Sequence, residues 1–237
     1  MRLANRHTAE ILAMMCEAVA PGVTTWDLDQ LARKEIGRRR VQSAFLGYYG
    51  YPAVICASIN EEVVHGIPRR DKVITPGDIV SLDFGVVVDG YVGDSAKSVL
   101  VGAGDDESTA LVRVTRECLE RAIERCTPDH RLSDIAQAVQ EHAEASGLGV
   151  VREFVGHGIG TRMHEEPQVP NYFCGHKPRL REGLVLAIEP MLNAGSHGVR
   201  VLPDGWTAVT KDGRRSAHFE HSIAITANGP DVLSSLE

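Results

Sequence analysis

Apolar residues recur at the spacing of an amphipathic helix in four segments of this 237-residue chain. The expected helices span residues 8–20, about 25–39, about 107–125 and about 132–146. Pro21-Gly22 ends the first of them, and Thr25 or Asp27 is placed to cap the second. The long stretches between the helices must therefore supply the rest of the core.

In those stretches, apolar residues follow one another in short runs that predict strands. One strand is expected near residues 54–57, and another follows the turn at 76–78 and holds Asp83. Asp89-Gly90 is a typical hairpin turn, so this second strand is expected to pair with residues 94–99. Two later apolar runs hold Glu189 and Glu220. The pattern thus predicts helices combined with antiparallel strands.

The second half of the pattern repeats the first at nearly one offset. The matching elements are Pro21 with Pro128, Asp27 with Asp134, and residues 77–83 with 183–189. Such matches indicate a duplicated unit of two helices and an antiparallel hairpin. The alternative is a chance similarity between ordinary turn-and-strand patterns. A true duplication would bring Asp83 and Glu189 face to face near the centre.

Asp83, Glu189 and Glu220 each stand alone inside an apolar run. A carboxylate removed from water without a partner costs several kcal/mol, so isolated buried acids are normally neutralised, paired or bound to metal. The hairpin would bring Asp94 beside Asp83 on the adjacent strand. His157 stands between glycines, a pattern that taken alone is more typical of a buried structural histidine. Together these five residues form a candidate metal site.

Four carboxylates and one imidazole are a hard, oxygen-rich donor set that suits Mn, Fe, Co or Zn. One divalent ion would leave excess negative charge in the interior, whereas two ions would balance four carboxylates. The sequence therefore favours a pair of ions about 3.5–4 Å apart. Such a pair makes hydroxide available near neutral pH, so hydrolysis is the expected chemistry.

Composition and charge agree with an ordinary enzyme. The net charge is −7 and the basic residues are scattered, which argues against a dedicated nucleic-acid surface. The five cysteines are odd in number and lack CxxC spacing, as expected in a reducing compartment. No apolar run approaches the ~20 residues of a membrane span, and no signal peptide is recognisable. A cytoplasmic protein is expected.

Five separated motifs resemble, in type and order, those of the type I methionine aminopeptidases of peptidase family M24. They are His65 in VVHGIP, the Asp83 and Asp94 pair, residues 156–160 with 163–167, residues 188–191, and residues 219–222. The likeness runs from about residue 10 to the C-terminus. It implies an α+β pita-bread fold, in which two pseudo-symmetric halves of antiparallel sheet, with helices packed outside, enclose a dimetal centre. Residues 1–237 would form one catalytic domain, with the repeat over residues 8–100 and 108–225.

The resemblance also implies a role for each motif residue. Asp83 would be a terminal ligand of one metal ion, Asp94 and Glu220 would bridge, and His157 and Glu189 would complete the second site. Glu189 would in addition shuttle protons. His65 would hydrogen-bond the scissile amide, and His164 would polarise the carbonyl group and stabilise the oxyanion.

An apolar slot for an unbranched thioether side chain is implied as well. Its residues would be Phe45, Tyr48, Tyr51, Cys56, Met163 and Trp206. Aromatic and sulfur groups make soft contacts with a thioether, although the same residues would also suit an ordinary core. Met163 departs from the aromatic residue usual before the second histidine. The remaining histidines, His218 among them, are expected to be surface or structural residues.

The implied function is removal of the initiator methionine from nascent chains whose second residue is small, with Co, Mn, Fe or Zn as cofactor. The protein would act as a monomer near the ribosome, without a membrane. One rival is an Xaa-Pro aminopeptidase or prolidase, which shares the ligand set but generally carries a separate N-terminal domain. The other is a non-catalytic relative that binds RNA or protein, although such relatives typically lose metal ligands.

The chain departs from the family pattern at its start. Family members usually carry a short extra segment before the first helix, and this chain begins partway into it. Two explanations stay open, a different start codon and a naturally shortened form. The N-terminal extensions and the helical insertion of type II enzymes have no counterpart in the sequence, so the minimal bacterial-style form is expected.

Overall fold

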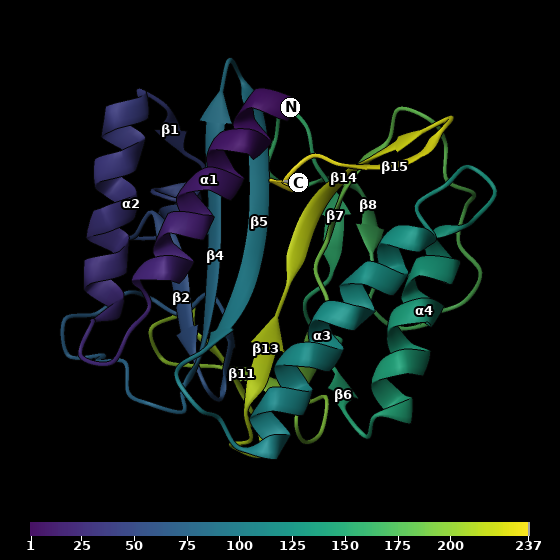
Figure 1. The fold of residues 1–237 in the computed structure, drawn as a ribbon. Helices are drawn as coiled ribbons and strands as arrows, with labels where there is room; N and C mark the ends of the chain where they lie inside the picture. The colour runs from purple at the N-terminus through teal and green to yellow at the C-terminus, as the bar shows by residue number, and fades with distance from the viewer. Residues whose placement is uncertain (237) are drawn as a thin grey trace.

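The computed structural model describes residues 1–236 and contains both helices and strands in that range (Figure 1). The helices are α1 (Arg2–Ala18), α2 (Thr25–Arg39), the short 3-10 turn η1 (Tyr48–Gly50), α3 (Asp106–Glu124) and α4 (Leu132–Ala145). The first-half strands are β1 (Gln42–Ser43), β2 (Ile55–Ile59), β3 (Glu62–Val64), β4 (Ile79–Val88) and β5 (Tyr91–Leu100). The second-half strands are β6 (Gly149–Val150), β7 (Gly156–Gly158), β8 (Glu165–Val169), β9 (Val185–Ile188), β10 (Met191–Asn193), β11 (Val199–Val201), β12 (Ala208–Thr210), β13 (Ser216–His218), β14 (Glu220–Thr226) and β15 (Gly229–Val232).

Strands from both halves of the chain form one nine-stranded sheet. Its main order is β1-β4-β5-β14-β9-β7-β8, with β2 also paired to β4 and β15 paired to β14. Two three-stranded sheets, β13-β10-β6 and β11-β12-β3, accompany it. The pairing of β5 with β14 is antiparallel and joins the halves at the middle of the main sheet.

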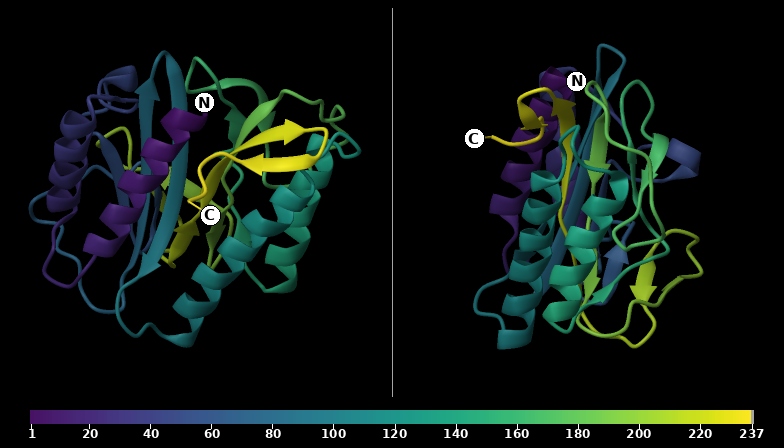
Figure 2. Two further views of the ribbon diagram at one scale, coloured as in Figure 1. Left: turned by 45° about the horizontal axis from the view of Figure 1, so that its top comes forward. Right: turned by 90° about the vertical axis from the view of Figure 1, so that its right-hand side faces the viewer.

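The helices cover the sheet in two pairs. In Figure 1, α1 and α2 lie over the first-half strands, and α3 and α4 lie over the second-half strands. The right-hand view in Figure 2 shows α1, α3 and α4 on one side of the sheet and long connecting loops on the other. Each pair has its own apolar cluster, since Ile11 and Leu28 pack with Phe84, and Leu111 and Ile135 pack with other core residues. Helices packed outside a sheet were expected, and this arrangement agrees.

None of the helices within residues 1–236 combines the length and the apolar character that a bilayer-spanning helix needs.

The ends of α2, α3 and α4 lie within a residue or so of their expected positions, but the expected start of the first helix was wrong. Helix α1 begins at Arg2 instead of residue 8. Ala4, Asn5 and Thr8 are buried, because α1 packs closely on β5 at Gly93. The buried face of the first turns thus contains polar residues, so hydrophobic periodicity did not identify these turns as part of the helix.

The cap of α2 also differs from the expectation. Thr24 is the N-cap, rather than Thr25 or Asp27. Its hydroxyl accepts a hydrogen bond from the Asp27 amide at 3.1 Å, while the Asp27 carboxylate accepts one from the Thr24 amide at 2.9 Å. This is a reciprocal capping box, in which Asp27 is the second member.

The predicted hairpin is present, with Asp89 and Gly90 between β4 and β5. Both residues have positive φ, 50° and 79°, as a two-residue hairpin turn requires. Asp83 lies opposite Ala96, and Asp94 lies opposite Gly85. Asp83 and Asp94 are thus diagonal neighbours on adjacent strands.

The two halves share local backbone patterns at the starts of their helices and strands. Thr24 forms an isolated bridge with Val73, and Arg131 forms one with Arg179. The amide of Ile74 donates to Val23 at 2.8 Å, and that of Leu180 donates to His130 at 2.9 Å. Gly77 and Gly183, which precede β4 and β9, both have a φ of 88°. The halves are pseudo-symmetric, and β5 and β14, which meet at the centre of the sheet, lie between β4 and β9.

Candidate active site

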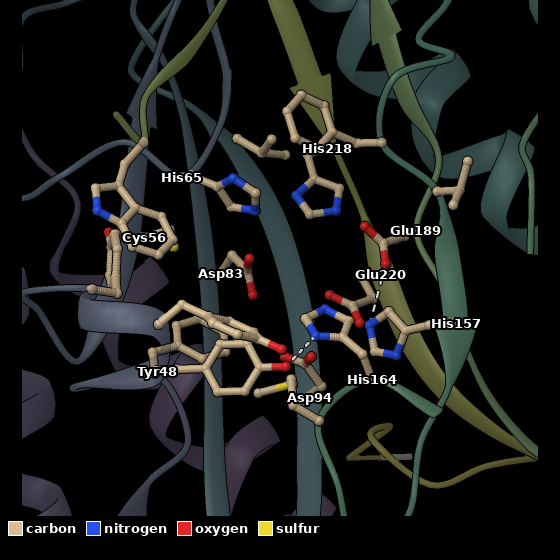
Figure 3. A pocket seen from close by; sticks show the side chains of 18 residues that line it. Tyr48, Cys56, His65, Asp83, Asp94, His157, His164, Glu189, His218 and Glu220 are labelled. Carbon is tan, nitrogen blue, oxygen red and sulfur yellow. Dashed lines mark hydrogen bonds and ion pairs between the residues drawn. The ribbon is translucent and has the colours of Figure 1, made fainter. Parts of the chain in front are cut away.

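A cavity of about 250 Å³ opens where the two halves of the sheet meet (Figure 3). All the site residues that the sequence singled out line it. They are Phe45, Tyr48, Tyr51, Cys56, His65, Asp83, Asp94, His157, Met163, His164, Glu189, Trp206 and Glu220. Figure 3 shows the carboxylates and imidazoles pointing toward one another.

Strand pairing brings two of the acids together in the middle of the main sheet. Glu220 lies opposite Ala96, so it is a diagonal neighbour of Asp94. Two serine hydroxyls fix this register, because Ser95 donates to the Glu220 carbonyl at 2.8 Å and Ser222 donates to the Asp94 carbonyl at 2.9 Å. The carboxylates therefore have fixed positions before any ligand binds.

The four acids crowd one another in a largely buried site. Asp94 and Glu220 are only 4% and 3% exposed. Burial raises the pKa of Asp83 to about 7. Burial, and then the neighbouring carboxylates, raise the pKa of Asp94 and Glu220 well above the usual range, and burial with the Asp83 charge does the same for Glu189. Keeping all four ionised at neutral pH requires cations.

Several carboxylate oxygens of the site lack hydrogen-bond partners, which suits the binding of a cation. Within residues 1–236, Asp83 Oδ1, Asp94 Oδ1 and Glu220 Oε1 are buried and have no hydrogen-bond partner. No lysine or arginine is among the described lining residues. Buried carboxylate oxygens without donors are what hard divalent ions bind.

His157 completes this fit with one nitrogen. Its Nδ1 donates to the Gly158 carbonyl at 3.0 Å, which leaves Nε2 as the unprotonated nitrogen. Burial lowers the pKa of His157 to about 4, so the ring is neutral at physiological pH. A backbone carbonyl behind the ring is the usual support for a metal-binding histidine. Donor atoms of Asp94, His157 and Glu220 all lie within 4.8 Å of one another.

Asp83 and Glu189 lie outside that group of three but at the same cavity. Glu189 follows β9, its Oε1 lies 3.5 Å from His157 Nε2, and its backbone carbonyl accepts a hydrogen bond from Asn171 at 3.0 Å. Asp83 comes from β4 and acts electrostatically on Asp94, Glu189 and Glu220. The five residues together offer donors beyond those that one ion needs.

His65 sits on the cavity wall in an uncommon backbone conformation. Its φ is 60°, in the left-handed region, where a non-glycine residue is worth attention. The ring stands edge-on to Phe154 and to Trp206, with centroids 5.2 and 6.4 Å away. Burial lowers its pKa to about 4. The imidazole is thus held neutral against aromatic walls.

His164 lies at the mouth of the cavity, in the loop between β7 and β8. Its Nδ1 is 2.7 Å from the hydroxyl of Tyr48. Its ring stands edge-on to that of His157, with centroids 4.3 Å apart. Desolvation lowers the pKa of His164 below the usual value. In Figure 3 the His164 ring lies beside that of His157, whereas the His65 ring lies on the side of His218.

The apolar part of the cavity combines aromatic and sulfur-containing side chains. Tyr51, Cys56 and Met163 are buried, and the Tyr51 ring stands edge-on to Trp206 at 5.0 Å. The Tyr51 hydroxyl donates toward the carbonyls of Ile55 and Gly66, at 3.0 and 3.2 Å, so no polar group of this side chain faces the slot. Burial raises the pKa of the Cys56 thiol well above its usual value, which keeps it neutral.

Some of the lining residues were not expected from the sequence, and His218 is the most polar of them. We expected His218 to be a surface or structural residue, but it lines the cavity and is 2% exposed. Its Nε2 has no hydrogen-bond partner within residues 1–236, and burial lowers its pKa to about 3. The alternation of side chains in an extended chain, counted back from Glu220 in β14 to His218 in β13, was the available signal. Phe154, on an irregular segment, gave no such signal.

Comparisons with known proteins identify the family. Residues 1–227 match metallopeptidase family M24. Methionine aminopeptidases of Aquifex aeolicus and Escherichia coli are 48% and 44% identical to the chain; the alignments cover 100% and 99% of it, and 95% and 89% of the relatives. The crystal structure of a methionine aminopeptidase from Thermotoga maritima matches with a TM-score of 0.97 at 47% identity, over 99% of this chain and 95% of that one.

A more distant structure shares the fold alone. An Xaa-Pro dipeptidase from Bacillus anthracis matches with a TM-score of 0.78 at 19% identity, and the match covers all of this chain but 59% of that one. The pita-bread fold expected from the sequence is thereby confirmed. The chain belongs to metallopeptidase family M24 and, within it, to the methionine aminopeptidases.

Proposed function

We propose that this chain removes the N-terminal methionine from polypeptides whose second residue is small. One observation carries the proposal: a slot walled by aromatic and sulfur-containing side chains opens directly onto four crowded carboxylates and His157. A thioether side chain suits such a slot through soft contacts with Cys56 and the aromatic rings. The bond to be cut would then lie over the carboxylates.

We further propose that two divalent ions occupy the site, held by Asp83, Asp94, His157, Glu189 and Glu220. Two ions would balance the charge of four carboxylates, whereas one would leave a net negative charge in a buried site. The mixed oxygen and nitrogen donors suit Co, Mn, Fe or Zn. Such ions supply Lewis acidity and make water acidic enough to attack near neutral pH.

Three side chains would then handle protons and developing charge. Glu189 would accept a proton from the attacking water and return it to the leaving amine, a role that suits its raised pKa. His65 would hydrogen-bond the amide of the scissile bond. His164 would donate to the carbonyl oxygen and stabilise the negative charge that develops there.

The setting of the reaction follows from the same arrangement. The continuous sheet and the cavity at its centre support one catalytic domain over residues 1–237, built from the repeat at 8–100 and 108–225. We propose that it acts as a monomer in the cytoplasm on nascent chains near the ribosome. The negative net charge supports the absence of a dedicated nucleic-acid surface.

Peptide cleavage tests the proposal. With Mn or Co added, the protein should cleave Met-Ala-Ser, should cleave Met-Leu-Ser far more slowly, and should leave Ala-Pro-Ala intact. A preference for Ala-Pro-Ala would instead indicate an Xaa-Pro peptidase. The absence of both bound metal and cleavage, across several peptides, would indicate a non-catalytic binding protein. Chelated protein is the control, and it should be inactive.

A further inference from the structure

Tyr48 and His164 are hydrogen-bonded across the mouth of the cavity, although 116 positions separate them in the chain. The Tyr48 hydroxyl oxygen lies 2.7 Å from His164 Nδ1. Tyr48 belongs to η1 in the first half, and His164 belongs to the loop before β8 in the second half. Figure 3 shows this contact as a dashed line, with the other ring nitrogen of His164 directed into the cavity.

The imidazole of His164 has little other support. It is exposed at the mouth and lies in residues 159–164, which form no strand. The backbone of this loop is held, since the amides of Thr161 and Arg162 each donate to the Glu165 carboxylate at 2.9 Å. The ring itself contacts His157, and within residues 1–236 no hydrogen bond other than that with Tyr48 reaches it. Tyr48 is thus the polar group that decides how the ring is turned.

The loop that carries Tyr48 is rigid enough for this task. The Ser43 hydroxyl accepts hydrogen bonds from the amides of Phe45 and Leu46, at 3.2 and 3.1 Å. The amide of Gly47 donates to the Tyr51 carbonyl at 2.8 Å, and Gly47 has a φ of 82°. The Tyr51 hydroxyl ties the end of the loop to the segment that holds His65. A fixed loop therefore presents the Tyr48 hydroxyl to His164.

Hydrogen-bond chemistry decides the direction of the contact. A phenol is a good donor and a weak acceptor, whereas the unprotonated nitrogen of an imidazole is a strong acceptor. The nitrogen that accepts from a partner cannot carry the ring proton, so the proton is on the other one. With Tyr48 as donor to Nδ1, the proton of neutral His164 is on Nε2, which is the nitrogen directed into the cavity.

We propose that Tyr48 is a positioning residue whose hydroxyl donates to Nδ1 of His164, which fixes the ring orientation and keeps a proton on Nε2 for the substrate carbonyl oxygen. This rests on the proposed function, in which His164 stabilises the developing oxyanion. This positioning role differs from the contribution of Tyr48 to the wall of the methionine slot. The positioning role requires the hydroxyl group, whereas the wall requires only the ring.

The kinetic test removes the hydroxyl and keeps the ring. Tyr48→Phe should lower kcat for Met-Ala-Ser about 10-fold, as expected when one hydrogen bond that orients a catalytic group is lost. KM should stay within about 2-fold, because the aromatic wall is retained. Tyr91→Phe removes a hydroxyl from an exposed tyrosine on the hairpin rim and should leave both constants unchanged. Metal content should match the wild type in both variants.

A spectroscopic test does not depend on activity. In the zinc-loaded enzyme with ¹⁵N-labelled histidine, His164 should show a hydrogen-bonded acceptor at Nδ1 and a protonated Nε2. In Tyr48→Phe the Nδ1 signal should move to the position of an unbonded nitrogen, while Tyr91→Phe should leave it in place. A protonated Nδ1 in the wild type would overturn the assignment.

The kinetic outcomes separate this inference from the proposed function. An unchanged or higher kcat in Tyr48→Phe would overturn the positioning role, and so would a raised KM with unchanged kcat, which indicates a wall residue only. Failure of the wild type to cleave Met-Ala-Ser would instead contradict the proposed function. The wild-type nitrogen spectrum still decides the hydrogen-bond direction in that case, and also if Tyr48→Phe does not fold.

Discussion

At the scale of single residues, the energetics of the site are dominated by acids held close together away from water. Burial raises the pKa of Asp83 to about 7, and burial together with the Asp83 charge raises the pKa of Asp94 on the next strand. Each such group favours its protonated form in the folded protein and its ionised form in the unfolded chain. Without metal, the site therefore opposes folding at neutral pH.

Replacing Asp83 tests this cost in metal-free protein. The pKa of Asp83 is higher in the folded protein than in the unfolded chain. The stability that this carboxyl group contributes is therefore present below roughly pH 4 and is lost as the pH rises toward about 7. Metal-free Asp83→Asn should therefore exceed the wild type in free energy of unfolding by a margin that grows between about pH 4.5 and pH 7.5. Urea denaturation at the two pH values measures it.

Comparing the two proteins removes an opposing contribution from histidines. Burial lowers the pKa of His65 and His157 to about 4, so the contribution of these histidines to the free energy of unfolding decreases as the pH falls. This decrease should be the same in both proteins. Adding Mn should reverse the order at the higher pH, because the wild type binds the ion more tightly. A margin independent of pH would contradict the raised pKa of Asp83.

His164 allows catalysis to be separated from metal binding. Loss of an oxyanion donor typically costs 10²–10³ in kcat, so His164→Ala should lower kcat by about 100-fold or more. Its metal content, measured by elemental analysis, should equal that of the wild type. His176→Ala, a change at an exposed histidine of a distant loop, is the control and should change neither quantity. Loss of metal in His164→Ala would mean that His164 is a ligand.

At the scale of elements, α1 packs closely on β5. A Cβ atom on Gly93 would lie 2.6 Å from the carbonyl carbon of Ala4 and from the amide nitrogen of Asn5. Glycine at this position lets the helix lie directly on the strand that carries Asp94. The packing of α1 thereby supports the site from the opposite side of the sheet.

Two glycine substitutions should have opposite effects on stability. Gly93→Ala should destabilise the protein by about 1–3 kcal/mol, because backbone atoms of α1 must move to admit the methyl group. Gly37→Ala lies in α2, where a Cβ atom meets nothing within 4 Å, and should stabilise by roughly 0.5–1 kcal/mol. Thermal and urea unfolding measure both. Equal effects of the two changes would refute the close packing of α1 on β5.

At the scale of the whole molecule, the site exists because two pseudo-symmetric halves meet. The first half supplies Asp83 and Asp94, and the second supplies His157, Glu189 and Glu220. Since β5 pairs with β14, the central acids come from both halves and share one rigid sheet. Metal binding should therefore stabilise the fold as a unit.

Metal stoichiometry tests the assignment of ligands across the halves. The wild type should bind two Mn ions per chain, as four carboxylates require for charge balance. His157→Ala should bind about one, because it removes a ligand of a single site, whereas Asp94→Asn should weaken both sites. Calorimetry with elemental analysis gives the counts. One tight ion in the wild type would contradict the proposal of two ions, and two tight ions in Asp94→Asn would contradict the proposal that Asp94 serves both.

Local sequence determined much of this protein. Asp89-Gly90 specified the hairpin that aligns Asp83 with Asp94, and isolated acids in apolar runs indicated a cation site, because turn chemistry and the cost of burying charge act over short distances. Tertiary structure decided the rest. The early start of α1 depends on a contact with Gly93, and the bond from Tyr48 to His164 joins two segments that lie far apart in the chain. Contacts between segments distant in the chain leave no periodic pattern in either segment, so only the assembled fold reveals them.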